Sequence, residues 1–170
     1  MEISLLTPKC TLVPADFFEP ARVRDLLSAV CSLNGDEDVR YVEIPQYAAW
    51  LVYCDDRQSA AISENEVSGG EEPLPDLFYI LQALPGCPEY NKILCAWRGG
   101  YVFLGIAQGK TLLLANAYPA QDFLTAEYYI FRALKSLQLN PEVSTICWRA
   151  GLGADEEMSL YRYFKAVERL

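Results

Sequence analysis

An acidic stretch from Asp55 to Asp76 divides this chain and limits what can fold as one piece. It reads DDRQSAAISENEVSGGEEPLPD and has seven acidic residues against one arginine, a net of −6 within a formal net charge of −9. Its serine, glycine and proline content offers little apolar surface to repay the entropy of ordering. We therefore predict a partial N-terminal α/β lobe at 1–54, a mobile acidic linker at 55–76 and a C-terminal lobe at 77–170.

Composition places the chain among globular proteins with an apolar core. Of its 170 residues, 52% are apolar and 12% are aromatic, which is enough for one domain or two small lobes. No window approaches the roughly 18 consecutive apolar residues that span a bilayer. The N-terminal MEISLLTPKC also lacks the basic flank and the apolar core of a signal peptide. We therefore predict a cytoplasmic protein without membrane insertion.

The absence of histidine excludes several kinds of chemistry. Without histidine, neither a Ser-His-Asp triad nor a Cys/His zinc site can form. The six cysteines contain no C-x-x-C pair, which favours reduced core thiols, and the acids lack calcium-loop spacing. We therefore predict no bound metal. An acidic chain without a basic stripe also repels phosphate backbones, so we expect no nucleic-acid binding.

Strand and helix patterns alternate on both sides of the acidic stretch. Before it, the patterns predict strands at 2–6, 10–14, 39–45 and 48–54, and a helix at 19–33 that Asn34-Gly35 ends. After it, they predict a helix at 74–84, strands at 93–97, 101–107 and 111–118, a helix at 120–138, a strand at 143–148 and a helix at 155–169.

The last two predicted helices carry signals at their ends. Asp155 is placed to cap the last helix, and basic residues follow toward its end, which complements the helix dipole. Its buried stripe is predicted to be Leu160, Tyr161, Phe164 and Val167. Asp122 is the predicted cap of the helix at 120–138. Glu127 follows five positions later on a different face, so an acid–base pair with Asp122 is not expected.

The helix at 120–138 is more apolar than a surface helix requires. One face is predicted to be buried and consists of Phe123, Ala126, Ile130, Leu134 and Leu137. A second face is also partly apolar, which favours packing against other elements over a subunit contact. If the helix does carry an interaction surface, the candidate residues are Tyr128, Tyr129 and Arg132.

The stretch GIAQGKT, from Gly105 to Thr111, ends like a phosphate-binding P-loop. It has three residues instead of four between the first glycine and Gly-Lys, and a strand pattern follows instead of a helix. We therefore predict a tight hairpin turn at Gln108-Gly109.

The element order after the acidic stretch is strand, strand, strand, helix, strand, helix. This is the order of the ribonuclease-H-like unit from which actin-like proteins are assembled. The segments TLVPADFF at 11–18 and LLLANAYPAQDF at 112–123, with its continuation to 152, resemble an uncharacterised bacterial family of unknown function with an actin-like ATPase fold. The resemblance implies an α/β fold with a ribonuclease-H-like C-terminal lobe and a smaller first lobe. Family members have a further meander before TLVP, so either the chain is trimmed at its start or its first lobe is reduced.

The resemblance also implies where a nucleotide would bind. Actin-like ATPases hold phosphate with a hairpin between the first two strands of a lobe, preceded by a metal-positioning Asp, and hold adenosine near a Gly-Gly turn after the last parallel strand. In the matching hairpin, ILCAWRGGYVFLGI, the letters AWR stand where the acid is expected, and no Ser or Thr follows. The candidate degenerate nucleotide groove is therefore made of Arg98, Gly99, Gly100, Gly151 and Gly153.

Two functions are compatible with these patterns. The favoured one is a non-catalytic cytoplasmic interaction or scaffold module that has lost the phosphate-binding residues, has no cofactor, and binds an unidentified protein or a second copy of itself. The alternative is a nucleotide-binding or phosphotransfer protein that uses an altered ATPase site, with ATP as its ligand. Under the favoured function we expect at most weak anion binding at Arg98 and no hydrolysis.

Overall fold

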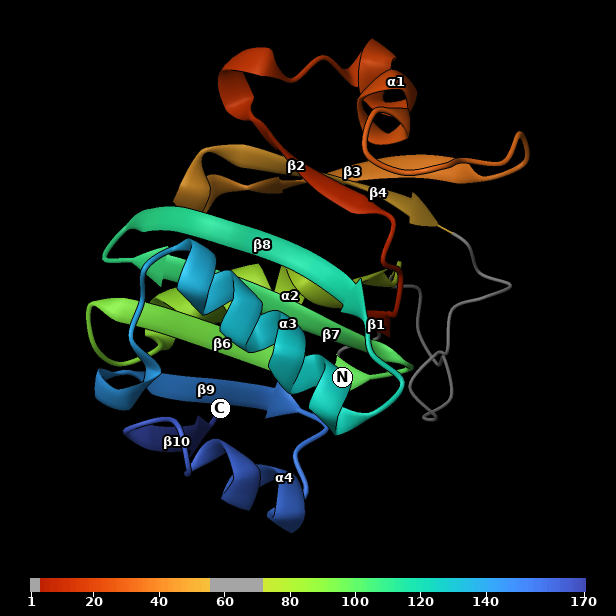
Figure 1. The fold of residues 1–170 in the computed structure, drawn as a ribbon. Helices are drawn as coiled ribbons and strands as arrows, with labels where there is room; N and C mark the ends of the chain where they lie inside the picture. Colours follow the sequence, from red (N-terminus) through yellow and green to blue (C-terminus); the bar gives the residue numbers. More distant parts are fainter. Residues whose placement is uncertain (1–3, 56–71) are drawn as a thin grey trace. The chain divides into compact units, whose positions relative to one another are not determined.

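The computed structural model describes residues 4–55 and 72–170 (Figure 1). The chain divides into two compact units, Met1–Tyr79 and Ile80–Leu170. The predicted mobility of the acidic linker concerns mainly residues 56–71, which lie outside the described ranges, and the predicted domain boundaries remain predictions. Within the described ranges, no helix combines the length and the apolar character needed to cross a membrane.

The first unit contains a three-stranded antiparallel sheet in the order β2-β4-β3. Its strands are β2 (Cys10–Pro14), β3 (Asp38–Ile44) and β4 (Ala49–Asp55), each close to its predicted range. Helix α1 (Val23–Ser28) lies against this sheet (Figure 1), with its contact formed by the buried residues Val13, Leu27, Val52 and Cys54. A short strand β1 (Ser4–Leu5) pairs in parallel with β5 (Leu74–Pro75).

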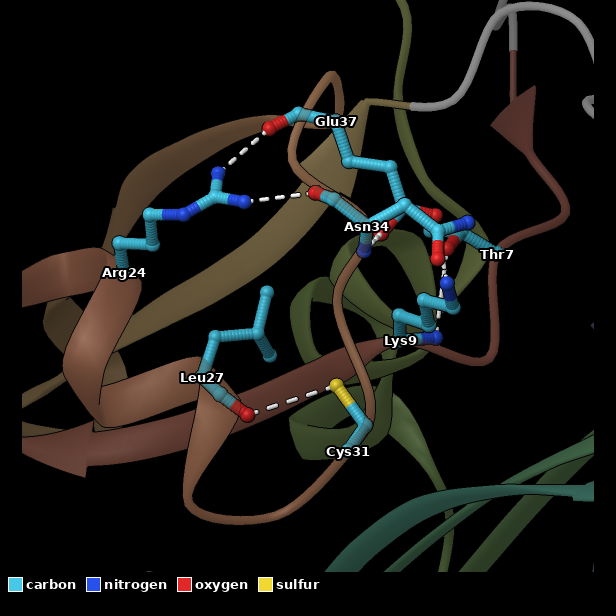
Figure 2. Close-up of polar contacts among 7 residues, drawn as sticks. All are labelled: Thr7, Lys9, Arg24, Leu27, Cys31, Asn34 and Glu37. Atoms are coloured by element: carbon cyan, nitrogen blue, oxygen red, sulfur yellow. Dashed lines mark hydrogen bonds and ion pairs between the residues drawn. The ribbon is translucent and has the colours of Figure 1, made fainter.

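The predicted helix at 19–33 is too long at its C-terminal end. A 3₁₀ turn at Pro20–Arg22 leads into α1, which ends at Ser28. Figure 2 shows what competes with a longer helix. The Arg24 guanidinium donates to the carbonyl oxygens of Asn34, at 2.6 Å, and Glu37, at 2.8 Å. These bonds draw the chain after α1 back toward the helix and favour a loop over further helical turns.

Glu37 fixes the same loop from its other side (Figure 2). Its carboxylate accepts from the backbone N–H of Asn34 at 2.7 Å and pairs with the Lys9 ammonium at 2.5 Å. The hydrogen bond from Lys9 to Glu37 raises the pKa of the Lys9 ammonium. Because Lys9 lies just before β2, this pair ties the loop to the edge of the sheet.

The two ends of the predicted acidic linker belong to regular elements. Asp55 ends β4, and its carboxylate is buried and pairs with Arg40 of β3 at 3.1 Å. Arg40 also pairs with Glu72 at 2.6 Å. Strand β5 follows, and helix α2 (Asp76–Ala83) begins at the last acid of the stretch.

The second unit is built on a five-stranded sheet in the order β10-β9-β6-β7-β8 (Figure 1). Strands β6 (Asn91–Arg98), β7 (Tyr101–Gln108) and β8 (Thr111–Pro119) form the predicted antiparallel meander. Gly109, with a φ of 56°, and Lys110 form the turn between β7 and β8. The hairpin is therefore confirmed, one residue later than predicted, and a P-loop is excluded. Strand β9 (Thr145–Ala150) is parallel to β6, as a crossover connection requires.

Helix α3 (Phe123–Ser136) makes this crossover and covers one face of the sheet (Figure 1). Its predicted buried face is confirmed, because Ala126, Ile130 and Leu134 belong to the core cluster and Phe123 and Leu137 pack against it. The opposite face of the sheet packs against residues that begin at Ile80. A Cβ added to Gly105 of β7 would lie 2.8 Å from Ile80 Cγ2. Both faces of β6 and β7 are therefore covered, which explains why these strands are apolar runs without polar alternation.

The predicted helix at 155–169 is wrong beyond Leu160. Helix α4 spans Ala154–Leu160, and the chain then turns into strand β10 (Ala166–Arg169), which runs parallel to β9. Pairing with β9 supplies backbone partners that a continued helix would have to replace. The predicted cap is also wrong, because Gly153 stands at the N-cap position and Asp155 lies in the first turn. Of the predicted stripe, Leu160, Phe164 and Val167 are buried and Tyr161 is exposed.

Candidate functional site

The hairpin between β6 and β7 carries the predicted phosphate-side residues. Arg98 and Tyr101 face each other as its last strand pair. Gly99 and Gly100 form the turn with φ values of 62° and 78°, the left-handed conformation that a two-residue hairpin requires. A Cβ on Gly100 would lie 2.8 Å from the Gln121 amide nitrogen. Both glycines are therefore explained by the turn itself.

The predicted adenosine-side turn lies at the neighbouring strand end. β9 pairs with β6 through a register shift that places Ala150 opposite Ala96, so the two glycine-bearing turns are brought together as predicted. Gly151, with a φ of 81°, packs directly on the main chain of Trp97. A Cβ there would lie 2.7 Å from the Trp97 carbonyl carbon and closer still to its oxygen. The contact between the two turns is backbone against backbone.

Local structure also accounts for the glycine at position 153. It is the residue before α4, in extended conformation with a φ of −84°. The Glu156 carboxylate folds back over it, so that an added Cβ would overlap the carboxylate oxygen. Each of the five predicted groove residues is therefore found at one end of the sheet or just beyond it, and the positions of the four glycines follow from local backbone geometry.

The Trp97 side chain occupies the space between the β6 end and the start of α3. Its indole N–H donates to the Ala120 carbonyl oxygen at 2.9 Å. Its ring centre lies 5.4 Å from that of Phe123, which in turn lies 5.9 Å from that of Trp148. Three aromatic side chains therefore pack together near the carboxyl ends of β6 and β9, the end of the sheet at which open α/β proteins usually bind a ligand.

Acidic side chains do not gather into a metal site in the described part of the chain. No group of three or more Cys, Asp or Glu side chains is placed to hold a metal ion in residues 4–55 and 72–170. Asp122, the acid at the start of α3, is the predicted helix cap. Its Oδ1 accepts from the Thr125 backbone N–H at 2.7 Å, which confirms that prediction.

We expect Asp122→Ala to lower the melting temperature at pH 7 by roughly 2–4 °C through loss of this cap. The Thr125 backbone hydrogen bond lowers the pKa of the Asp122 carboxyl below its ordinary 3.8. A depressed folded-state pKa stabilises the fold above the unfolded-state pKa, and this contribution disappears as the pH falls through the folded value. Thermal scans from pH 7 to pH 2.5 should show the difference from wild type shrinking below about pH 4.

The control is Asp122→Asn, which keeps an acceptor oxygen and removes the charge. Its loss of melting temperature should be smaller than that of Asp122→Ala, and the pH dependence that comes from the Asp122 carboxyl should be absent. A deficit in Asp122→Ala that is equal at pH 2.5 and pH 7 would contradict a capping carboxylate.

The predicted interaction residues on α3 have different surroundings. Tyr128 is exposed, and its ring centre lies 5.3 Å from that of Tyr129. Tyr129 is half-buried and stacks on Tyr118 of β8 at 4.7 Å. Arg132 is exposed one turn after Tyr128. Tyr129 therefore belongs to the packing of α3 on the sheet, and Tyr128 and Arg132 remain on the outer surface.

An open hollow of about 550 Å³ lies beside Tyr128, and we call it the α3 groove. It is lined by Leu124, Thr125, Glu127, Tyr128, Phe131, Pro141 and Tyr163. A second hollow of about 470 Å³ shares Phe131 and Pro141 with it and extends the depression to Lys135 and Gln138. The Phe131 ring lies 4.9 Å from that of Tyr163, so α3 and the segment after α4 together form its wall.

Most residues of the α3 groove were missed by the sequence patterns. Pro141 and Tyr163 come from segments that were assigned to a loop and to the last helix, and nothing in their spacing indicates that they meet α3. Glu127 did carry a signal, because it stands between Ala126 and Tyr128 on a mostly apolar helix. A lone acid in that position indicates either a polar partner inside the protein or a ligand.

Strand order, the crossover helix and a solved structure together define an actin-like ATPase fold. The chain is similar to the crystal structure of a Bacteroides thetaiotaomicron VPI-5482 protein with an actin-like ATPase fold and unknown function, at 14% identity and a TM-score of 0.70. The match covers 96% of this chain and 65% of that one, so this chain spans about two thirds of its length. Residues 2–167 match the family described as Protein of unknown function (DUF3822), and the chain belongs to that family. These findings confirm the resemblance. Comparison with curated proteins gives no match.

Proposed function

We propose that this chain is a non-catalytic protein-interaction module of the bacterial cytoplasm and that its partner docks in the α3 groove. One observation carries the proposal: Leu124, Tyr128 and Tyr163 surround a single hollow while 76%, 58% and 47% exposed. Large apolar side chains that gather on an open surface with a polar rim mark interaction sites. Aromatic residues are also enriched in such interfaces, and lysine and glutamate are depleted.

The strand ends support the non-catalytic half of the proposal. The actin-like resemblance implies a carboxylate before the hairpin, and residues 96–100, AWRGG, have neither a carboxylate nor a hydroxyl for a metal. Phosphoryl transfer depends on a metal and on neutralisation of developing charge. The Trp97 indole is held by Ala120, and Gly151 lies on the Trp97 carbonyl group, so a nucleotide would first have to displace packed groups.

The alternative, a nucleotide-binding protein with an altered site, rests on the meeting of the two glycine-bearing turns. Arg98 ends β6, and the turn of Gly99 and Gly100 follows it. Gly151 and Gly153 follow the adjacent β9. A guanidinium group attracts anions, and glycines allow a ligand to approach the backbone closely. Measuring partner capture and ATP binding on the same chain can therefore separate the two functions.

We expect Leu124→Asp to reduce capture of protein partners at least about tenfold in affinity pull-downs with the tagged chain. Leu124 is the second residue of α3, where an acidic side chain favours the helix dipole, so the variant should fold as wild type. The matched control is Tyr90→Asp, because Tyr90 is 68% exposed and does not line the groove. Proteins that bind wild type and Tyr90→Asp but not Leu124→Asp are the expected partners.

Titration calorimetry with ATP and Mg²⁺ completes the test. We expect no binding tighter than about 1 mM and no hydrolysis. Tight magnesium-dependent binding that is lost in Gly100→Val would favour the alternative. Equal capture by wild type and Leu124→Asp would contradict an interaction through the α3 groove.

A further inference from the structure

One residue that lines the α3 groove is a largely buried glutamate. Glu127 is only 7% exposed and lines the groove between Leu124 and Phe131 of the same helix. Its Oε1 accepts a hydrogen bond from the Ser159 hydroxyl of α4 at 2.6 Å. This bond holds the carboxylate in place and leaves most of its acceptor capacity unused, since an ionised carboxylate offers about four lone-pair positions.

Glu127 lacks the basic partner that a buried carboxylate usually has. Among residues 4–55 and 72–170, the carboxylate accepts a side-chain hydrogen bond from Ser159, and neither Lys nor Arg pairs with it. The same chain shows the usual solution at Asp55, whose side chain is 4% exposed and pairs with Arg40 at 3.1 Å. A carboxylate that is partly shielded from water and has no cation beside it attracts a positive charge more strongly than a fully solvated one, so an arriving cation would be stabilised at Glu127.

The walls of the groove suit an organic cation better than a metal ion. Three aromatic side chains, Tyr128, Phe131 and Tyr163, line the same groove as Glu127, and no second carboxylate is among the lining residues. Aromatic rings attract ammonium and guanidinium groups through their faces and also pack on the aliphatic stems that carry them. A metal ion such as Mg²⁺ or Ca²⁺ instead needs several oxygen ligands.

We infer that the α3 groove binds a Lys or Arg side chain of an apolar segment in the partner protein, with its cation on Glu127. The inference rests on the proposed function and names the chemistry of the partner. The open groove fits a protein segment, because its rim residues Leu124 and Tyr128 remain exposed over most of their surface. Arg132 and Lys135 are also exposed on α3, so the segment should carry one basic residue with neutral or acidic neighbours.

The test uses two acetylated and amidated peptides, Leu-Lys-Leu and the same peptide with norleucine in place of lysine. Each is titrated into the isotopically labelled whole chain, and the amide signals of α3 are followed by NMR. We expect the lysine peptide to shift the signals of Glu127, Tyr128 and Phe131 and to bind about tenfold more tightly than the norleucine peptide. In Glu127→Gln, which keeps an oxygen to accept from Ser159, the preference should fall to about threefold or less, because only the aromatic rings still attract the ammonium.

A second variant, at an exposed residue, tests the groove independently in case Glu127→Gln changes the fold. Tyr128→Ala removes an exposed wall of the groove without touching the core, and it should weaken the lysine peptide severalfold while Glu127 remains. The inference is overturned if the lysine peptide does not shift α3 signals, if wild type binds both peptides equally, or if the full preference survives in Glu127→Gln. If Leu124→Asp loses the captured partner and Glu127→Gln retains it, the proposed function stands and the cation subsite does not.

Discussion

Gly151→Ala is expected to destabilise the chain by about 3 kcal/mol or more. Two costs combine at this position. The φ of 81° is unfavourable for any residue with a Cβ, and the new methyl group would overlap the carbonyl group of Trp97. Relief requires moving the end of β9 away from β6, which breaks the parallel pairing near Ala150. Urea unfolding followed by far-UV circular dichroism measures the shift in midpoint at constant slope.

Gly86→Ala is the matched control in the same unit. An added Cβ at Gly86 meets nothing within 4 Å, so the change should stay within about 0.5 kcal/mol of wild type. A loss below about 1 kcal/mol in Gly151→Ala would show that the two strand ends separate easily. A ligand could then separate Gly151 from the Trp97 carbonyl group, and this contact would no longer be an argument against nucleotide binding.

Trp148→Ala should cost about 3–5 kcal/mol. Trp148 is 1% exposed, belongs to the core between the sheet and α3, and donates its indole N–H to the Ala150 carbonyl at 2.6 Å. Truncation leaves a cavity and also leaves the Ala150 carbonyl without that donor. Unfolding should be followed by circular dichroism, because the substitution itself changes the tryptophan fluorescence.

Tyr90→Ala provides the comparison for Trp148→Ala, because Tyr90 is an aromatic residue of the same unit with 68% of its surface exposed. It should stay within about 0.5 kcal/mol of wild type. Trp148→Phe should fall between the two, since it keeps most of the packing and loses the hydrogen bond. A Trp148→Ala midpoint that matches Tyr90→Ala would place Trp148 outside the cooperative core.

The elements that local patterns determine were predicted well. Strands β6 and β7 are apolar runs closed by a Gly-Gly turn, and Gly109 marks the next turn. Helix α3 has both a helical apolar period and a capping Asp122. In each case the residues that decide the structure lie within one element or beside it, so the sequence is enough to find them.

The elements that depend on distant partners were predicted poorly. The segment from Ala166 to Arg169 has a helical charge pattern, but it pairs with β9, and the N–H of Lys165 is held by the carbonyl groups of Pro141 and Ser144. The end of α1 is decided in the same way, by the hydrogen bonds of Arg24 to the loop at 34–37. Such contacts join residues ten or more positions apart and leave no periodic signal.

In the candidate site, too, the parts that depend on local patterns were predicted and the parts that depend on distant contacts were not. The resemblance correctly brought the hairpin at 99–100 beside Gly151, because both positions follow from strand order. It could not show that the Trp97 ring contacts Ala120 and Phe123. The sequence around Trp97 shows only a strand pattern, which does not identify the partners of its side chain. The α3 groove was only partly predicted through Tyr128, because its other wall is Tyr163, which depends on the turn between α4 and β10.

Strand β10 also limits how this protein can associate. It forms one edge of the five-stranded sheet, is only four residues long and carries Glu168 and Arg169, with Arg169 held by Glu157 at 2.7 Å. Short, charged edge strands resist the addition of a foreign strand, which is how natural sheets avoid aggregation. A partner at this end of the sheet is therefore expected to recognise side chains and not to extend the sheet by backbone pairing, so assembly here should remain reversible and selective.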